Sequence, residues 1–294
     1  MPVPVFLAVI AVLGVSASGP LMAATAAPAL AIAFWRNAGA VALVAPFALT
    51  RSRVEIRGLG TRGWLLSAFA GAMLAAHFAA WVSALKLTSV AAATALVTTQ
   101  LIWVVLIDRI KGVKPTGAIL AGMGLSISGV LLISGFDFAL SGRAVTGDAL
   151  AVLGGLFAAL YLLAGNEIRK TLSTTSYTFL CYGFCAAFLA LGSWTFGISL
   201  AGFSTRSWLL IAAVTISAQL LGHSLFNHLL AVMSPTLISL IILLEVPGAA
   251  LLAGVFLGQA PPWGVYAGLT LILLGLSVVA SQRKSASTDV VLAE

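Results

Sequence analysis

Charged residues are scarce in this chain of 294 residues, of which 8% are charged and 61% are hydrophobic. The mean hydropathy is +1.13, and ordinary soluble domains carry about 25% charged residues. So little charge excludes a soluble domain and indicates a polytopic membrane protein. The formal net charge of +7 does not indicate a nucleic-acid partner, because Lys and Arg lie in short loops between apolar runs and not on one basic face.

Cysteine is also scarce, since Cys181 and Cys185 are the only two. They share one apolar run, at a spacing poorly suited to a disulfide, and they are too few for a structural metal site. The Gly-x-x-x-x-Gly-Lys pattern of nucleotide-binding loops is absent from the sequence. We therefore predict no metal, no cofactor and no direct use of ATP by this chain, and we expect both cysteines to pack as small hydrophobic residues.

Long apolar runs account for most of the chain, and turn and charge signals divide it into ten of them. Runs of about 20 residues cross a bilayer as helices, and these runs lack the alternation of membrane β-strands. The first run resembles a signal peptide, but no Lys or Arg precedes it, so we expect it to be the first span. The sequence therefore predicts an all-α membrane protein with spans at residues 3–24, 28–49, 63–86, 88–107, 115–134, 148–165, 175–196, 206–229, 234–257 and 262–281.

The positions of Lys and Arg orient these spans, because cytoplasmic loops are rich in both. If the N-terminus is cytoplasmic, the outer loops hold only Lys86, Arg143 and Arg206. The inner loops then hold Arg51, Arg53, Arg57, Arg62, Arg109, Lys111, Lys114, Arg169, Lys170, Arg283 and Lys284. We expect a multi-pass protein of the cell membrane, the inner membrane in a bacterium, with both termini cytoplasmic and a disordered cytoplasmic tail at 285–294.

The sequence contains an internal repeat. Thr61-Arg62-Gly63-Trp64 recurs as Thr205-Arg206-Ser207-Trp208, and a shift of 146 residues aligns further identical residues. These pairs are His77 with His223, Gly112 with Gly258, Pro115 with Pro261, Ala121 with Ala267, Gly122 with Gly268, Leu125 with Leu271 and Gly129 with Gly275. Five spans in each copy force the second copy to enter the membrane inverted. We predict two inverted five-helix repeats, 1–146 and 147–284, on which many secondary transporters build alternating access.

The motifs of the chain are similar to those of the drug/metabolite transporter superfamily. They are Phe34-Trp35-Arg36-Asn37 in the second span, Ser234-Pro235-Thr236 at the start of the ninth, and the segment from Gly258 to Gly275 that ends the second half. Within that superfamily the chain resembles the EamA family, and most of all the YddG-type amino-acid exporters. The chain departs from the family where a glutamate usually follows a glycine, since it has Gly258-Gln259 and Gly112-Val113.

Polar residues recur every four positions in the eighth predicted span, as Thr215, Gln219, His223 and Asn227. In an α-helix this spacing forms one stripe that drifts by about 40° per step. The stripe either packs against other helices or lines a polar cavity. The two large donors favour the cavity, so we predict that Gln219, His223 and Asn227 contact a solute.

Glu245 lies near the middle of the ninth predicted span, two residues before Pro247. A buried glutamate in hydrocarbon costs a few kcal/mol and therefore marks a functional site. Pro247 cannot donate its amide and clashes with the carbonyl of Leu243, so the helix should bend there. Glu245 is either a structural carboxylate, paired for example with Arg36 or His223, or a site for proton exchange or for a substrate ammonium group.

Further candidates line the third, fourth and sixth spans, and the repeat pairs His77 with His223 and Thr99 with Glu245. Threonine and glutamine supply donors and acceptors, and tryptophan supplies an apolar platform. Each threonine has the alternative of bonding to its own helix, and each histidine of packing in the interior. The predicted substrate-binding residues of these spans are His77, Trp81, Thr98, Thr99, Gln100, Trp103 and Tyr161.

Three features have mainly structural interpretations. Arg36 is expected to extend to the outer interface or to form a structural pair, with attraction of a carboxylate at an outer gate as the lesser alternative. Gly19 and Pro20 should interrupt the first span, which points to a nearby binding site. Small residues in the fifth and tenth spans, including Gly264-x-x-x-Gly268, predict close helix packing, in a monomer or a homodimer.

These features favour a secondary transporter, with a small solute and the lipid bilayer as partners. The resemblance implies export of amino acids, including aromatic or hydrophobic ones, with other small solutes or drugs as the alternative. Proton coupling through Glu245 and the histidines is open. An intramembrane serine enzyme at Gly14-Val15-Ser16 is disfavoured, because a nucleophile needs an oriented base and the histidines occupy repeat-related positions. A passive channel would show a filter or ring sequence and none is visible, but a uniporter with weak gating would look the same in sequence.

Overall fold

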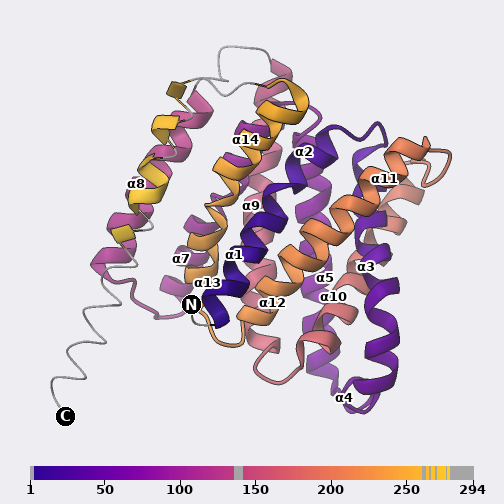
Figure 1. The fold of residues 1–294 in the computed structure, drawn as a ribbon. Coiled ribbons are helices and arrows are strands. Elements are labelled where there is room, and N and C mark those ends of the chain that lie inside the picture. The colour runs from indigo at the N-terminus through magenta and orange to yellow at the C-terminus, as the bar shows by residue number, and fades with distance from the viewer. Residues whose placement is uncertain are drawn as a thin grey trace, which may run out of the picture.

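The protein, described here by a computed structural model, is a bundle of helices (Figure 1). The structure describes residues 3–135 and 142–259, and beyond them residues 263, 264, 266–268, 270–275, 277 and 278. No strand occurs in these residues. The predicted tail at 285–294, together with Pro261, Arg283 and Lys284, lies outside them.

The helices follow one another along the chain and are labelled as in Figure 1. The first half contains α1 (Val3–Ser16), α2 (Ser18–Ala23), α3 (Ala29–Arg51), α4 (Arg53–Arg57), α5 (Thr61–Ala84), α6 (Val90–Val97), α7 (Gln100–Ile110) and α8 (Gly117–Gly135). The second half contains α9 (Gly142–Ile168), α10 (Thr174–Thr195), α11 (Thr205–Val214), the π-helix η1 (Thr215–Ser224), α12 (Leu225–Leu229), α13 (Pro235–Ile242) and α14 (Glu245–Leu257).

Eight helical stretches in the described residues are long and apolar enough to cross a membrane. They are Val3–Ala23, Ala29–Arg51, Thr61–Ala84, Val90–Ile110, Gly142–Ile168, Thr174–Thr195, Thr205–Leu229 and Pro235–Leu257. Each corresponds to one predicted span. The predicted fifth and tenth spans correspond to the shorter apolar helices Gly117–Leu132 and Tyr266–Gly275. Because the tenth lies partly outside the described residues, the total of ten stays a prediction.

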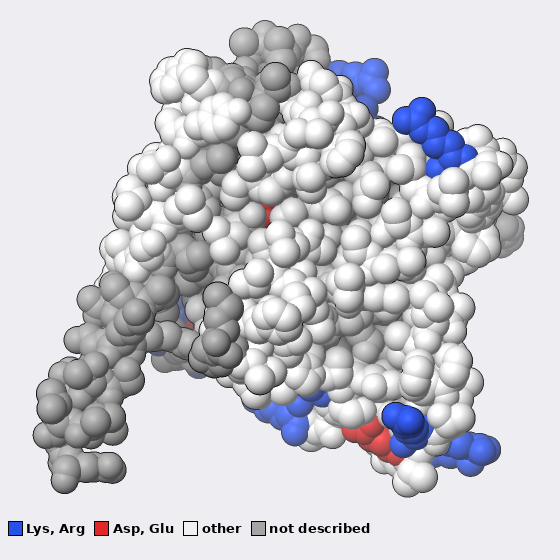
Figure 2. Space-filling view, in the orientation of Figure 1, with Lys and Arg blue, Asp and Glu red and all other residues white. Residues whose placement is uncertain are grey.

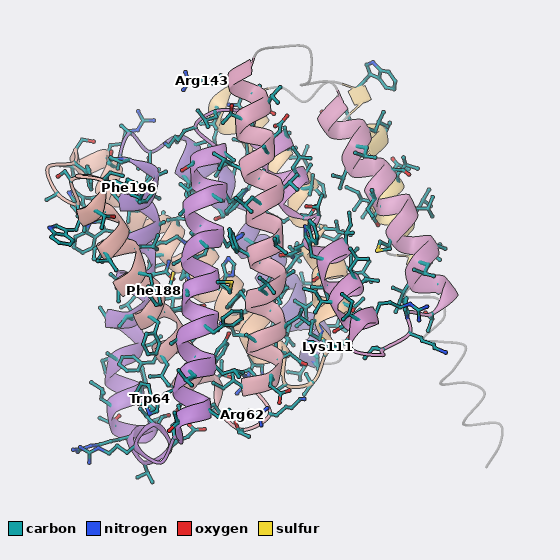
Figure 3. All side chains as sticks on the ribbon, turned by 180° about the vertical axis from the view of Figure 1, so that it is seen from behind. Arg62, Trp64, Lys111, Arg143, Phe188 and Phe196 are labelled. Atoms are coloured by element: carbon teal, nitrogen blue, oxygen red, sulfur yellow. The ribbon has the colours of Figure 1, made fainter. Side chains whose placement is uncertain are left out.

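On the face shown in Figure 2 most charged side chains gather at the two ends of the bundle, and the broad band between them is white apart from a small red patch near its centre. Arg62 and Lys111 lie at one end and Arg143 at the other (Figure 3). This separation is the one expected from the distribution of Lys and Arg in the loops.

The two halves run in opposite directions where the repeat relates them. The helix α4, which leads into α5, lies at the lower end of the bundle in Figure 1, whereas α11, which begins the equivalent span, lies at the upper end. The helices α7 and α14 also end alike, on Gly112 with φ +88° and Gly258 with φ +66°. Such left-handed positions favour glycine, which explains why the repeat retains glycine at both.

Three spans are broken near their middles. The first span breaks at Ala17, because Pro20 lacks an N–H and clashes with the carbonyl of the preceding turn. The other two breaks separate α6 from α7 and α13 from α14, at repeat-related positions. Pro247 causes the second of these, and the Leu243 carbonyl instead accepts from the amide of Val246 at 3.2 Å. The predicted bend is therefore present.

The break between α6 and α7 contains no proline. The Thr98 hydroxyl donates to the Ala95 carbonyl and the Thr99 hydroxyl to the Leu96 carbonyl, each at 2.6 Å. Threonine hydroxyls compete with backbone amides for such carbonyls, which weakens a helix at that point. The same break thus has two different chemical causes in the two halves.

The helix α8 packs against the Tyr266–Gly275 helix at the side of the bundle (Figure 1). A Cβ on Gly129 would lie 2.5 Å from the Gly268 carbonyl, and a Cβ on Gly275 would lie 2.4 Å from the Gly122 carbonyl. These contacts are reciprocal under the repeat, so the glycines of the fifth and tenth predicted spans bring the two helices together within one chain. The predicted scaffold role fits this position.

Candidate functional site

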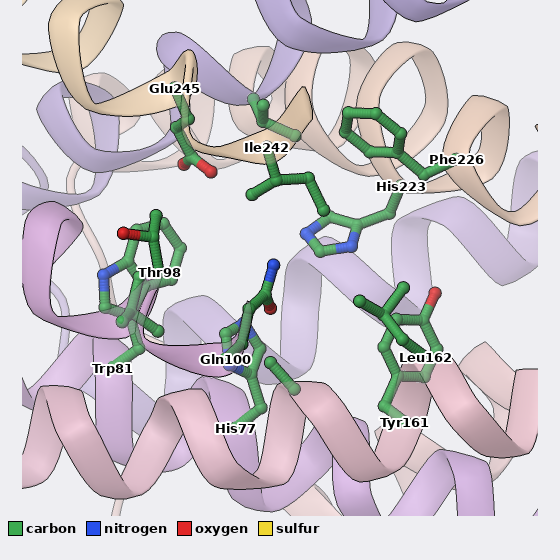
Figure 4. Close-up of a pocket in the computed structure, with 13 residues that line it drawn as sticks. His77, Trp81, Thr98, Gln100, Tyr161, Leu162, His223, Phe226, Ile242 and Glu245 are labelled. Atoms are coloured by element: carbon green, nitrogen blue, oxygen red, sulfur yellow. The ribbon is translucent and has the colours of Figure 1, made fainter. Parts of the chain in front are cut away.

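A narrow cavity lies between the two halves, at the level of the helix breaks (Figure 4). The first half contributes α1, α5 and the break between α6 and α7, and the second half contributes α9, η1, α12, α13 and α14. Seven predicted candidates line it, namely His77, Trp81, Thr98, Gln100, Tyr161, His223 and Glu245. Its apolar walls are Val15, Val97, Ala158, Leu162, Phe226 and Ile242.

Two consecutive glycines of α9 allow the helices around the cavity to approach one another. A Cβ on Gly155 would lie 2.7 Å from the Val97 carbonyl and 2.9 Å from the Thr99 hydroxyl, so alanine would not fit there. A Cβ on Gly154 would have an ordinary contact of 3.4 Å with Trp81. The Gly154-Gly155 pair therefore places α9 directly against the break between α6 and α7.

Aromatic rings form one side of the cavity. The rings of His77 and Trp81 stack with centroids 5.7 Å apart, and His223 lies 6.4 Å from His77 across the interface of the two halves. The Nδ1 atom of His77 is 3.0 Å from the Gly154 carbonyl, which fixes that ring. His223 has ring contacts but no hydrogen-bond partner among the described residues. The two repeat-related histidines are therefore held in different ways.

Several polar groups of the cavity have no partner within the described part of the chain. The Glu245 carboxylate, 6% exposed, forms neither a hydrogen bond nor an ion pair there. The buried Nε1 of Trp81 and Nε2 of Gln100 are also unpartnered. Unsatisfied buried groups cost free energy, about 1–3 kcal/mol for a neutral group and more for a charge. The cavity thus holds one acceptor of negative charge and two donors that a bound molecule would satisfy.

The sequence matches the EamA-like transporter family twice, over residues 3–135 and again over residues 145–281. The chain belongs to the EamA-like transporter family. The protein is therefore a multi-pass membrane transporter built from two copies of one family unit, and the cavity lies between those copies. No curated protein matches the chain.

A solved structure described as "Crystal structure of protein" resembles this transporter over 96% of this chain and 98% of the other, with a TM-score of 0.75 and 20% sequence identity. At that identity the likeness shows the fold. It supports the helical arrangement of the transporter as a whole and carries no argument about its substrate.

The predicted polar stripe of the eighth span does not line this cavity as a unit. Of its four residues only His223 is among the lining residues. The stripe was drawn for an α-helix, but residues 215–224 form a π-helix, in which a turn takes in more residues. A spacing of four residues is close to one turn in either kind of helix, so the hydrogen-bond partners of these side chains, and not the helix period, decide which of them face the cavity.

The other three residues of the stripe face protein. The Thr215 hydroxyl bonds to the Ile211 carbonyl at 2.8 Å. Gln219 accepts from Arg36 at 2.7 Å and donates to Asn37 at 3.1 Å. Asn227 accepts from the Tyr161 hydroxyl, which leaves the Tyr161 ring facing the cavity with its hydroxyl group anchored. Gln219 and Asn227 thus support the site from behind its lining.

Thr99 and Trp103 also lie outside the cavity lining in this structure. The Thr99 hydroxyl is bound to its own helix and lies against α9 at Gly155. Thr98 lines the cavity, but its hydroxyl is bound in the same way. The alternative that these threonines bond to their own helix therefore describes both.

Arg36 does not reach the membrane interface, and of its two expected interpretations the structural pair is the one that the structure shows. Its side chain is 0% exposed. Its Nε donates to Gln219, its Nη1 donates to Ser18 at 3.2 Å, and its guanidinium carbon lies 4.1 Å above the Phe78 ring. A structural pair with Gln219 replaces the expected contact with the interface, because buried acceptors from two other helices are within reach.

Sequence reasoning missed the apolar lining residues, including Leu162, Phe226 and Ile242. An apolar residue that lines a cavity and one that faces lipid look the same in a hydrophobic run, so no local signal separates them. The buried position of Arg36 had a signal, since a charge so deep in a span usually faces the protein interior.

Polar contacts close the bundle at its two ends. Glu55 of α4 accepts from the Ser173 amide at 2.6 Å and from the Ser173 hydroxyl at 2.5 Å, where α10 begins. Partial burial opposes ionisation, but the hydrogen bonds from Ser173 and Ser176 hold the pKa of Glu55 below its usual value. At the other end Lys86 donates to the Met22 carbonyl at 2.9 Å, and partial burial lowers the pKa of Lys86.

The serine proposed for an intramembrane enzyme has no base beside it. The Ser16 hydroxyl donates to the Val12 carbonyl at 2.8 Å, and the side chain packs against Gly248. Within the described residues no histidine contacts Ser16. This packing gives no support to an enzyme.

Proposed function

We propose that the protein is a secondary transporter that exports small metabolites across the bacterial inner membrane, by alternating access around the cavity between its halves. The proposed substrates are amino acids, including aromatic and hydrophobic ones. Both termini are taken as cytoplasmic, on the distribution of Lys and Arg.

The observation that carries this proposal is the pairing of an unpartnered carboxylate with aromatic walls in one cavity. Glu245 offers an acceptor for an ammonium group, and the rings of Trp81, Tyr161 and Phe226 offer a surface for an apolar side chain. The free donors of Trp81 and Gln100 suit a carboxylate. An amino acid carries all three groups.

The size of the cavity supports alternating access over an open pore. The space open to the centre of a water-sized sphere is about 30 Å³, and a single water needs about 10–15 Å³ by that measure. Such a space holds about two waters and no amino acid. A solute can therefore enter only after the lining helices separate, and the breaks in the fourth and ninth spans are places where they can bend.

Transport assays in proteoliposomes test the proposal. The purified protein is reconstituted and tested with labelled amino acids, sugars and nucleosides, first for uptake and then for counterflow with preloaded solute. We expect uptake of aromatic or hydrophobic amino acids and stimulation by solute on the opposite side. Uptake limited to sugars, nucleosides or drugs would replace the proposed substrate class, and flux without stimulation would indicate a channel.

Proton coupling is part of the same proposal, with Glu245 as the group that exchanges a proton for the substrate ammonium. In this scheme the Glu245 carboxylate holds either the proton or the ammonium group of the substrate. Imposing a pH gradient on the same liposomes tests it. Accumulation of amino acid against its gradient supports coupling, and equilibration without accumulation at every pH gradient contradicts it.

A further inference from the structure

Arg36 is a buried cation without an anion beside it. Its described contacts are Gln219, Ser18, the Met22 sulfur and the Phe78 ring, none of which carries a negative charge. Its Nη2 has no hydrogen-bond partner in the described residues. The two ion pairs within those residues both involve Glu167, at the charged end of the bundle. A fully buried guanidinium in this condition is costly and calls for a compensating charge.

Glu245 is the complementary case, a buried anion without a cation in contact. Both groups lie close to the cavity, since Glu245 lines it and a single aromatic ring, Phe78, connects it with Arg36. Arg36 covers one face of Phe78, and His223, which lines the cavity, lies 5.3 Å from the same ring. The cavity therefore lies in the field of two opposite charges that do not neutralise each other by contact.

The charge balance of the cavity decides which solutes can enter. In the deprotonated form that receives the solute, Glu245 balances Arg36, so with both histidines neutral the two groups together give a net charge of zero. A solute with one positive and one negative group leaves that balance unchanged when it binds. An amine would leave one uncompensated positive charge in a medium of low dielectric, and a carboxylic acid would leave one negative charge.

We propose that Arg36 and Glu245 act as a divided charge pair that selects zwitterions and rejects the corresponding amines and acids. Glu245 receives the positive group directly, whereas Arg36 acts from behind Phe78 through its charge and is a specificity-determining residue without direct contact. This inference rests on the proposed function, because it concerns the same cavity, and it assigns the selection to a residue outside the cavity lining.

Three solutes with one shared side chain test the pair. They are an aromatic amino acid, the amine formed by its decarboxylation, and the acid that lacks its amino group. Affinities of the purified wild-type protein for the three are measured by calorimetry and then by competition in counterflow. We expect the amino acid to bind best, and each single-charge analogue to bind about tenfold more weakly or worse.

Two substitutions should shift this order in opposite directions. Arg36→Gln leaves a net negative cavity, so the ratio of amine to amino-acid affinity should rise by about tenfold or more. Glu245→Gln leaves a net positive cavity, so the ratio of acid to amino-acid affinity should rise. The double variant restores neutrality and should prefer neither single-charge analogue. Ratios are used because a general loss of folding lowers all affinities together.

Two further variants keep the test decisive. Arg36→Lys retains the charge and should retain the wild-type order, and Ser18→Ala removes a neutral contact of Arg36 and should do the same. Elution as a single species and the thermal midpoint report folding for each. If no solute of the set binds the wild type, the proposed function fails. If the amino acid binds but Arg36→Gln leaves the ratio of amine to amino-acid affinity unchanged, the proposed selection by the charge pair is wrong. It is also wrong if Arg36→Lys changes this ratio as much as Arg36→Gln does.

Discussion

The two halves of this transporter have the same fold at the helix break and different chemistry. In the first half the break exists because Thr98 and Thr99 bond to backbone carbonyls. In the second half it exists because Pro247 cannot donate, and Glu245 stands where the first half has Thr99. The repeat therefore supplies a cavity that both halves build alike, and single substitutions within that frame make it asymmetric.

The buried charged residues beside the cavity also differ between the two halves. Beside the cavity each half provides one buried charged residue, Arg36 in the first and Glu245 in the second, and neither is matched by its repeat equivalent. The shift of 146 residues places Tyr182 opposite Arg36. The Tyr182 hydroxyl is 3.1 Å from the Ser224 hydroxyl, so the second half fills that position with a neutral hydrogen-bonding group. The comparison teaches that the repeat gives both halves the same helix breaks, whereas single positions within the repeat make the cavity chemically asymmetric.

The largest effect is expected from making the two halves alike at the break. Glu245→Thr reproduces the residue of the first half, and Glu245→Gln keeps the shape without the charge. Loss of a buried charged partner costs about 2–5 kcal/mol, so binding of an amino acid should fall by about 30-fold or more. Counterflow and calorimetry measure it, with Glu167→Gln at the exposed end as control. Undiminished transport by Glu245→Gln at every pH would remove Glu245 from the mechanism.

A steric test compares the two neighbouring glycines of α9. Gly155→Ala places a Cβ against the Val97 carbonyl, so α9 must move from the break at a cost of about 1–3 kcal/mol, and the thermal midpoint should fall. Gly154→Ala is the matched control, because its Cβ meets only an ordinary contact. Equal destabilisation by both substitutions would contradict the close approach at Gly155.

The paired histidines should separate stability from binding. His77→Ala removes the hydrogen bond to Gly154 and should lower the free energy of unfolding by about 1 kcal/mol. His223→Ala removes a ring that has no hydrogen bond in the described residues, so it should weaken solute binding more than His77→Ala does, with less loss of stability. Thermal unfolding and calorimetry on both variants measure the two effects. The reverse order would mean that His223 is the packing residue of the pair.

The smallest effect is expected at Glu55, far from the cavity. Glu55→Gln weakens the hydrogen bonds at the start of α10 and should cost about 1 kcal/mol without changing solute selection. Because the pKa of Glu55 is lowered in the folded protein, its contribution is present above the unfolded-state value of 4.5 and is lost as the pH falls below it. Thermal midpoints of wild type and variant should therefore converge in acid, and a constant difference down to pH 3 would contradict this role.

The fold could be predicted from the sequence to the extent that hydrophobic runs and repeats determine it. Eight spans, the interruption at Gly19-Pro20 and the bend at Pro247 were predictable, because run length and the missing proline amide act locally. The π-helix η1 was not predictable from the sequence, since we attribute it to the packing of α1 against η1 at Gly14 and Gly222. The spacing of the stripe was visible in the sequence, but the protein partners of Gln219 and Asn227 were not.

The sequence identified polar residues within the spans as candidates for the site. It could not show which of them face the cavity and which bond to other groups of the protein. A polar residue within a membrane span costs free energy, so such residues are candidates. Four of them line the cavity, namely His77, His223, Gln100 and Glu245. Gln219 and Asn227 met the same criterion and instead bond to protein groups. The choice between a partner in the protein and a free group depends on side chains distant in sequence, so residue type alone could not decide it.

One measurement tests the central claim most directly, which is that the cavity between the halves binds the transported solute. A crystal grown with a bromine-substituted aromatic amino acid gives an anomalous signal that locates the ligand without interpretation of weak density. The account predicts a bromine peak among the aromatic walls of the cavity and the ammonium nitrogen about 3 Å from the Glu245 carboxylate. A peak elsewhere on the transporter, with the cavity closed and Glu245 without a ligand, would contradict it.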